Sequence, residues 1–254
     1  MDRVYIFDVD GTLTPSRRPM EDVFENFFFR WANKNTFYLV TGSDLDKLKE
    51  QVPDWILELS QGIFTCSGNT YHIIEDEELI LKYDNKFEPS DELLEYLQEQ
   101  LITSPYKGRF GTHIENRGSM LNFSIVGRDC TLEQRLDFFE WDRMSKERES
   151  IANEINSRWP DIQAVIGGQI SIDITPVGKD KSQVLEHIES DFAIPFSEPK
   201  EYIFIGDRTM VGGNDYPLAK LMKETNDCSV YQAGEPSAEN GYIETRNILE
   251  KLNG

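Results

Sequence analysis

The chain is short of positive charge relative to negative charge. Its 254 residues include 26 lysines and arginines against 46 aspartates and glutamates, so the formal net charge is −20. Nucleic acids and anionic membrane surfaces bind clustered basic residues that displace counterions, and neither is expected as a partner. An anionic small molecule would need a local group of basic residues within this acidic chain.

Cysteine and histidine are also sparse, with three of each. The cysteines have neither disulfide-framework nor metal-ligand spacing, so free, reduced thiols are expected. The histidines are equally scattered and are expected at surface or packing positions. These residues are Cys66, Cys130 and Cys228, and His72, His113 and His187.

Long apolar runs are missing as well. No run approaches the about 20 residues that cross a bilayer. The N-terminus enters a strand-like segment at once, without the basic, apolar and small-residue regions of a secretory signal. We therefore expect a cytoplasmic protein, folded as one large domain or two modest ones.

Short apolar runs alternate with helical patterns at both ends of the chain. VYIFDV (4–9) and TFYLV (36–40) each precede a helical segment, and the alternation returns after residue 178. This order predicts an α/β fold with a doubly wound, Rossmann-like parallel sheet.

The pattern between the two ends is different and predicts an inserted α+β cap domain. We expect core segments 1–81 and 178–254 on either side of a cap at 82–177. The elements expected in the cap are a helix over 90–101, a strand around 113–128, one long charged helix over 131–159 and a strand over 167–175.

Polar residues follow three of the predicted core strands. Asp8 and Asp10 end the first, Thr41 and Ser43 follow the second, and Asp207 follows a late one. Carboxyl ends of parallel strands share one sheet edge, where open α/β sheets bind ligands, so these side chains are expected in one site. Two carboxylates this close indicate a cation between them, although a strand-capping turn is the simpler alternative.

A calcium loop of the EF-hand type does not explain the paired aspartates. Such a loop needs a glutamate at its twelfth position, and counting from Asp8 that position is Pro19. Mg²⁺, which prefers carboxylate and phosphate oxygens, fits better.

These residue types are the parts of a phosphoryl-transfer site. A carboxylate and a phosphate at about 4 Å repel by roughly 4 kcal/mol at an effective dielectric of about 20, so attack needs a cation. Asp8 is the expected nucleophile, forming an aspartyl-phosphate, and Asp10 the expected general acid and base. Thr41 or Ser43 would donate a hydroxyl to a phosphate oxygen. Further expected contributors are Lys181 as a positive charge on the transferring group, and Asp8, Asp10, Asp207 and Asp215 as ligands of Mg²⁺.

Four motifs in order resemble those of the haloacid dehalogenase-like (HAD) phosphotransferase superfamily. They are DVDGTLT (8–14), TGS (41–43), a lysine opening a helix (Lys181), and GD with GGND (206–215). Segments 8–17, 114–135, 167–181 and 204–215 further resemble the eukaryotic-type phosphomannomutase family, and the similarity runs over nearly the whole chain. NRGSM replaces the family's aromatic-Arg-Asn-Gly-Met run, and GKDK replaces Gly-Trp-Asp-Lys. Such differences bear on the sugar more than on phosphoryl transfer.

The resemblance implies a phosphohexomutase that interconverts mannose 6-phosphate and mannose 1-phosphate. It implies an aspartyl-phosphate, a hexose 1,6-bisphosphate intermediate and activator, and a homodimer formed through the cap. A sugar-phosphate phosphatase and a non-catalytic phosphosugar-binding protein remain alternatives. The implied ligands of phosphate and sugar are Arg17, Arg117, Asn122, Arg128, Arg135, Ser171 and Asp173.

Two residue patterns in the predicted cap favour an anionic sugar as its ligand. Strand alternation over 169–174 sends Gln169, Ser171 and Asp173 to one face and isoleucines to the other. Residues 106–135 hold five basic and three acidic residues, whereas the chain average would give them a net charge of about −2. The simpler alternative is that the arginines pair with the abundant carboxylates.

Overall fold

The computed structural model describes residues 2–191, 200–235 and 240–252. Within these ranges, no helix is long and apolar enough to span a membrane. The chain divides into two compact units. The core unit comprises Met1–Asp84, Lys179–Val211 and Asp215–Gly254, and the inserted unit comprises Asn85–Gly178 with Gly212–Asn214.

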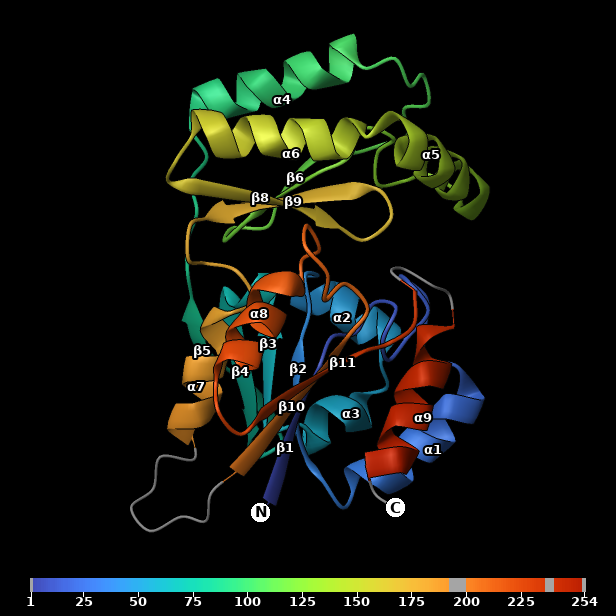
Figure 1. The fold of residues 1–254 in the computed structure, drawn as a ribbon, viewed down its shortest axis with the longest axis vertical. Helices are drawn as coiled ribbons and strands as arrows, with labels where there is room; N and C mark the ends of the chain where they lie inside the picture. Colours follow the sequence, from blue (N-terminus) through green and yellow to red (C-terminus); the bar gives the residue numbers. More distant parts are fainter. Residues whose placement is uncertain (1, 192–199, 236–239, 253–254) are drawn as a thin grey trace. The chain divides into compact units, whose positions relative to one another are not determined.

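The core unit contains a seven-stranded sheet in the order β11-β10-β1-β2-β3-β4-β5 (Figure 1). The five strands from β11 to β3 are parallel, as the βα alternation predicts, and β4 and β5 extend the sheet in antiparallel fashion. The strands are β1 (Asp2–Phe7), β2 (Thr36–Val40), β3 (Gly62–Thr65), β4 (Thr70–Glu75), β5 (Glu78–Asp84), β10 (Lys200–Gly206) and β11 (Cys228–Gln232).

Helices cover both faces of this sheet, which confirms the doubly wound α/β fold. Tyr5 and Phe7 of β1 pack in one apolar cluster with residues of α1 (Asp22–Ala32), α3 (Asp54–Leu59) and α9 (Gly241–Leu252). Val4 and Ile6 point to the opposite face, against α7 (Gln183–Asp191) and α8 (Tyr216–Glu224). Strand alternation thus gives β1 two buried faces.

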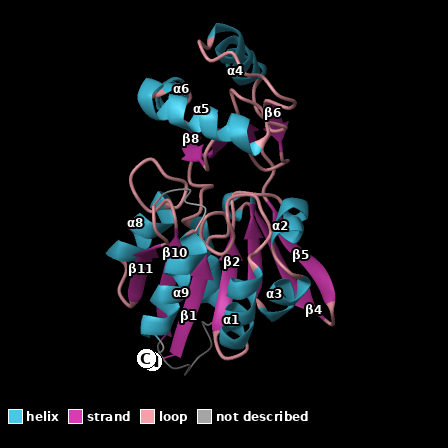
Figure 2. Ribbon diagram, turned by 90° about the vertical axis from the view of Figure 1, so that its right-hand side faces the viewer, coloured by secondary structure: helices cyan, strands magenta, loops and turns pink. Residues whose placement is uncertain are grey.

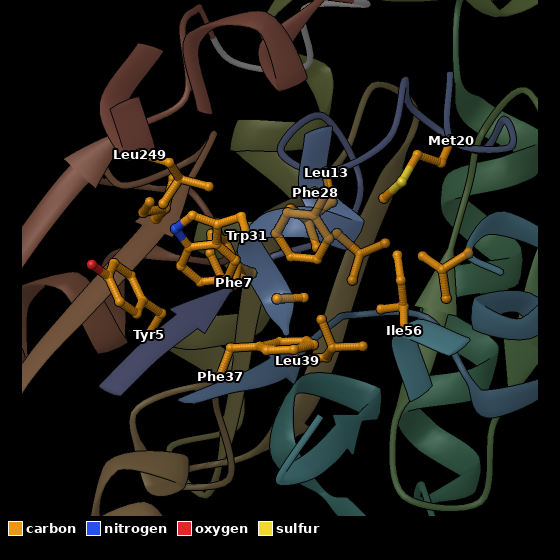
Figure 3. Packing of buried hydrophobic residues seen from close by; sticks show 14 of the residues in the cluster. Tyr5, Phe7, Leu13, Met20, Phe28, Trp31, Phe37, Leu39, Ile56 and Leu249 are labelled. Carbon is orange, nitrogen blue, oxygen red and sulfur yellow. The ribbon is translucent and has the colours of Figure 1, made fainter. Parts of the chain in front are cut away.

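The first of these clusters includes a group of packed aromatic rings (Figure 3). Phe7 meets Phe28 and Trp31 edge to face, with ring centroids 5.4 Å apart in both pairs. Edge-to-face contacts of this kind suit the ring quadrupoles. The aromatic segment of α1 therefore holds that helix against the sheet.

The inserted unit is an antiparallel sheet in the order β6-β7-β9-β8 with helices on one face (Figure 2). Apolar residues of the sheet, including Phe123 and Ile172, share a buried cluster with residues of all three helices. The elements are α4 (Asp91–Thr103), β6 (Ile114–Asn116), β7 (Leu121–Phe123), α5 (Leu132–Ser145), α6 (Glu147–Arg158), β8 (Ile162–Gly167) and β9 (Ser171–Pro176).

Two expectations for this unit are wrong. The long helix over 131–159 is broken at Lys146, whose φ of 58° is left-handed. Asp142 Oδ1 accepts a hydrogen bond from the backbone N–H of Arg148, in the first turn of the next helix, whose N-terminal N–H groups need such partners. The strand around 113–128 is a hairpin, closed by a hydrogen bond from Arg117 N to Met120 O.

Candidate active site

Three buried carboxylates come together in the core unit. Asp8 follows β1, Asp207 follows β10, and Asp215 directly precedes α8 (Tyr216–Glu224). Their oxygens lie within 4.8 Å of one another, and the residues are 3%, 3% and 0% exposed. Because β1 pairs with β10 in parallel, the first two aspartates leave neighbouring strands at the same edge.

Lys181 joins two of these carboxylates. Its Nζ donates to Asp8 Oδ1 and to Asp215 Oδ1, at 2.6 Å in each case, and the side chain is fully buried. The lysine lies in the turn just before α7 (Gln183–Asp191). Contacts this short between full charges are charge-assisted hydrogen bonds.

Two glycines let the backbone approach the carboxylates. A Cβ on Gly206 would lie 2.7 Å from Asp215 Oδ2, and one on Gly11 would lie 2.7 Å from Asp207 Oδ2. Gly11 also has a φ of +80°. Any side chain at either position would displace a carboxylate of the cluster.

The charges of the cluster are unbalanced. Burial, reinforced by the neighbouring Asp215, raises the pKa of Asp8 well above its usual range, although Lys181 opposes the shift. Burial disfavours the charge on Lys181, yet the two carboxylates outweigh it and raise the pKa of the lysine. Lys181 is shared between two carboxylates of a cluster of three, and oxygen ligands of this kind suit a hard divalent cation. The residues therefore fit Mg²⁺.

The side chain of Asp10 is bound elsewhere. Its Oδ1 accepts hydrogen bonds from Arg17 N at 2.7 Å and Gln51 Nε2 at 2.9 Å, and its Oδ2 lies 3.3 Å from the Ser43 hydroxyl. Among the described residues, the group with metal-ligand spacing is Asp8, Asp207 and Asp215. The side chain of Asp10 is not in that group, and its role as a metal ligand stays a prediction.

The predicted hydroxyls lie in the loop after β2. Thr41 is fully buried, and its Oγ1 accepts a hydrogen bond from Ser43 N at 3.0 Å. A hydroxyl that the sequence analysis did not single out contacts the expected nucleophile, because Thr12 Oγ1 donates to Asp8 Oδ2 at 3.3 Å. The position of Thr12 in the DVDGT motif, four residues after Asp8, could have indicated this contact from the sequence.

A second group of predicted residues meets on the sheet of the inserted unit. Asn122 lies opposite Asp173 across β7 and β9, and its Nδ2 donates to Asp173 Oδ1 at 2.6 Å. Arg128 Nη1 donates to Ser171 Oγ at 2.7 Å. The polar face of β9 is thus made of linked side chains, and it is buried like the isoleucine face.

Glu115 partners two of the predicted arginines. Its Oε2 accepts from Arg117 Nη2 at 2.6 Å and lies 3.5 Å from Arg128 Nε. The sequence analysis missed this glutamate, although its place two residues before Arg117 was a local signal for that pair; its contact with Arg128 had no such signal. Arg135 is 7% exposed, and Arg17, in the core unit, contacts Asp10 through its backbone N–H.

Comparison with known families agrees with this arrangement. The family described as eukaryotic phosphomannomutase matches residues 24–236. The chain belongs to this family. The phosphomannomutase of Encephalitozoon cuniculi is 39% identical over 85% of this chain and 83% of the relative, and that of Saccharomyces cerevisiae is 34% identical over 84% and 83%. The expected enzyme class, phosphomannomutase, is thereby confirmed.

Solved structures show that this phosphomannomutase-family chain has the HAD fold. The HAD subclass IIB sugar phosphatase BT4131 has a TM-score of 0.57 at 15% identity, covering 99% of each chain. A Plasmodium falciparum IMP-nucleotidase has a TM-score of 0.64 at 17% identity, covering 99% of this chain and 68% of its own. At such identities the likeness concerns the fold alone.

Proposed function

We propose that this enzyme interconverts mannose 6-phosphate and mannose 1-phosphate through an aspartyl-phosphate on Asp8. A hexose 1,6-bisphosphate serves as intermediate and activator. The observation that carries the proposal is the bond of Lys181 to Asp8 within a buried cluster of carboxylates. A carboxylate that must attack a phosphate needs positive charge beside it, and such a cluster has no simpler structural use.

Asp8, Asp207 and Asp215 would hold Mg²⁺, with Asp10 as a further proposed ligand. The ion supplies positive charge that offsets the repulsion between a carboxylate and a phosphate. Lys181 adds a fixed charge at the same place. Thr12 orients the other oxygen of Asp8, and Thr41 donates a hydroxyl to a phosphate oxygen.

Asp10 acts as acid and base. It protonates the sugar oxygen that leaves phosphorus, and it removes a proton from the hydroxyl that later attacks the aspartyl-phosphate. The contacts support this division of work, since Asp8 bonds to Lys181 and Asp10 to neutral donors.

The inserted unit binds the rest of the substrate. In a mutase the bisphosphate must exchange its two phosphates between half-reactions, so a second phosphate site is required. Arg117, Arg128 and Arg135 bind the phosphate that is not reacting, with Arg17 as a further phosphate ligand. Asn122, Ser171 and Asp173 bind sugar hydroxyls.

We also propose that the protein is a homodimer formed through the inserted unit. Helix α5 (Leu132–Ser145) exposes three apolar side chains, Leu132, Leu136 and Met144, which are 47%, 40% and 87% exposed. Burying them against a second copy would remove this apolar surface from water.

One assay separates a mutase from a phosphatase. Mannose 1-phosphate is supplied with and without glucose 1,6-bisphosphate, and mannose 6-phosphate and inorganic phosphate are both followed. A mutase must be primed by the bisphosphate and releases little phosphate, because water is kept from the aspartyl-phosphate. Stoichiometric phosphate release without the isomer would show a phosphatase, and binding without turnover would show a non-catalytic protein.

A further inference from the structure

A buried glutamine contacts the carboxylate to which we give the acid and base role. Gln51 is the last residue of α2 (Leu45–Gln51) and is 2% exposed. Its Nε2 donates to Asp10 Oδ1 at 2.9 Å and lies 3.4 Å from Thr14 Oγ1. Its main-chain oxygen accepts a hydrogen bond from Met20 N at 2.9 Å, so its backbone is fixed beside the loop that carries Asp10.

The other amide atom of Gln51 is unsatisfied. Its Oε1 is buried and has no hydrogen-bond partner in the described part of the chain. Burying an unpaired carbonyl is unfavourable, and an apolar side chain of similar volume would avoid it. Stability therefore does not explain a glutamine here, whereas its bond to Asp10 does.

The donors around Asp10 distinguish its two oxygens. Oδ1 accepts two short hydrogen bonds, from Gln51 and from Arg17 N, which together fix the plane of the carboxylate. Oδ2 has one long contact, 3.3 Å from the Ser43 hydroxyl. Oδ2 is thus the oxygen left for proton exchange.

We propose that Gln51 is a positioning residue for acid and base catalysis, holding Asp10 so that Oδ2 meets the sugar oxygen. This inference rests on the proposed function. In the step concerned, an Asp8 oxygen forms a bond to phosphorus, the bond from phosphorus to the sugar oxygen breaks, and that oxygen takes the proton from Asp10 Oδ2. In the reverse transfer the incoming hydroxyl returns the proton to Oδ2.

Dependence on the leaving group tests the proposal. A sugar hydroxyl leaves phosphorus only with a proton, whereas acetyl phosphate releases acetate and needs none. Gln51→Met removes the amide at nearly constant volume. It should lower kcat for mannose 1-phosphate by about 10- to 100-fold, part of the full effect of general acid catalysis, with KM little changed. The rate at which acetyl phosphate phosphorylates Asp8 should stay within about twofold, because that reaction needs no acid.

Gln51→Glu provides a second variant should the methionine not fold. It keeps the length of the side chain but replaces the donor by a like charge, and it should show the same selective loss. A variant that slows both substrates equally, or slows neither, would overturn the positioning role.

Control variants separate this inference from the proposed function and from general effects of changing a buried residue. Asp10→Asn should show a larger selective loss, and adding Gln51→Met to it should cause little further loss, because the two residues act as one unit. If Asp10→Asn shows no selectivity, the proposed function fails. If Asp10→Asn slows the mannose 1-phosphate reaction selectively and Gln51→Met does not, the inference alone fails. Ser60→Ala, which removes a buried hydroxyl bonded to Leu57 O, should leave the ratio of the two rates unchanged.

Discussion

At the scale of single residues, Lys181 is a charged side chain buried in the core unit. The side chain is fully buried, and its ion pairs with Asp8 and Asp215 offset the free energy that the ammonium group loses when it leaves water. A buried ion pair tolerates replacement of both partners better than the loss of one, because the remaining charge is left uncompensated. In this cluster three carboxylates would be left.

Lys181→Met should therefore abolish turnover and also destabilise the fold. Without metal, we expect the free energy of unfolding to fall by about 3–5 kcal/mol, measured by denaturant titration. Mg²⁺ should restore part of the loss by supplying positive charge to the same carboxylates. Lys82→Met breaks a solvent-exposed pair with Glu75, and its effect should stay below about 1 kcal/mol. Equal losses in the two variants would contradict the account.

Asp8→Asn should remove essentially all turnover and all acid-labile, hydroxylamine-sensitive phosphate from the protein, because the amide cannot form an acyl phosphate. The variant should stay folded, as judged by circular dichroism. Treating the parent with excess chelator should also stop turnover, and added Mg²⁺ should restore it. Substantial activity in the variant would refute Asp8 as nucleophile, and activity untouched by chelator would refute the metal.

Arg128→Ala should weaken binding of phosphosugars. The change removes a charge-assisted contact to phosphate worth roughly 1.5–3 kcal/mol, to be measured as the loss in kcat/KM for mannose 1-phosphate. Acetyl phosphate, which has no second phosphate, should react at Asp8 as in the parent. An unaffected phosphosugar reaction would contradict a phosphate site in the inserted unit.

At the scale of elements, the break between α5 (Leu132–Ser145) and α6 (Glu147–Arg158) is the feature most at odds with the sequence pattern. Lys146 occupies the left-handed region at φ 58°, which an L-residue with a Cβ adopts at a cost of about 1–2 kcal/mol. The ion pair of Asp142 with Arg148, at 2.7 Å and almost fully buried, joins the two helices across the break. Tertiary contacts thus override a continuous helical pattern.

Lys146→Gly should stabilise the protein, since glycine adopts positive φ without this strain. The expected gain in unfolding free energy is about 1 kcal/mol, reduced by the greater freedom of glycine in the unfolded chain. Lys146→Ala is the matched control, because it also loses the exposed contact with Glu149 but keeps the strain. A glycine variant no more stable than the alanine variant would show that the left-handed residue is unstrained.

At the scale of the whole molecule, each unit has an apolar core of its own, and both contain buried tyrosines. Burial raises the pKa of Tyr96 to about 12, and burial with a bond to Asp137 raises the pKa of Tyr106 to about 12. In the unfolded chain both phenols titrate near 10. The stability that each neutral phenol contributes is therefore fully present below pH 10 and is lost as pH rises from about 10 to 12.

Tyr96→Phe should lessen this alkaline loss. The linkage gives one such phenol about 1.4 kcal/mol of lost stability by pH 11, so the difference in unfolding free energy between pH 9 and pH 11 should shrink by roughly that amount in the variant. Urea titrations at the two pH values measure it. An identical loss in parent and variant would mean that Tyr96 ionises normally in the folded protein.

The sequence by itself determined what depends on local periodicity and on where strands end. Alternating βα segments predicted the parallel core, and the continuous apolar run of β1 predicted its two buried faces. The sequence also placed Asp8 and Asp207 at strand ends, whereas the pairing of their strands was decided by the fold. The order of the HAD motifs pointed to the family before any contact was known. Element boundaries and helix breaks were harder to predict from the sequence. Lysine is a good helix former, yet Lys146 has the left-handed conformation that ends a helix.

The tertiary structure alone decided which distant side chains meet. Gln51 lies 41 residues from Asp10, and no sequence pattern indicated their contact. The motifs predicted Lys181 in the site of Asp8, 173 residues away, but its hydrogen bond to Asp8 came only from the fold. Glu115 meets Arg117 two residues along the chain, but its contact with Arg128, 13 residues away, depends on the fold. Strand order and helix packing fix these pairings, and they separate one aspartate in a buried, charged cluster from another held by neutral donors. The two aspartates differ because burial beside like charges raises the pKa of Asp8, whereas hydrogen bonds from neutral donors orient the side chain of Asp10.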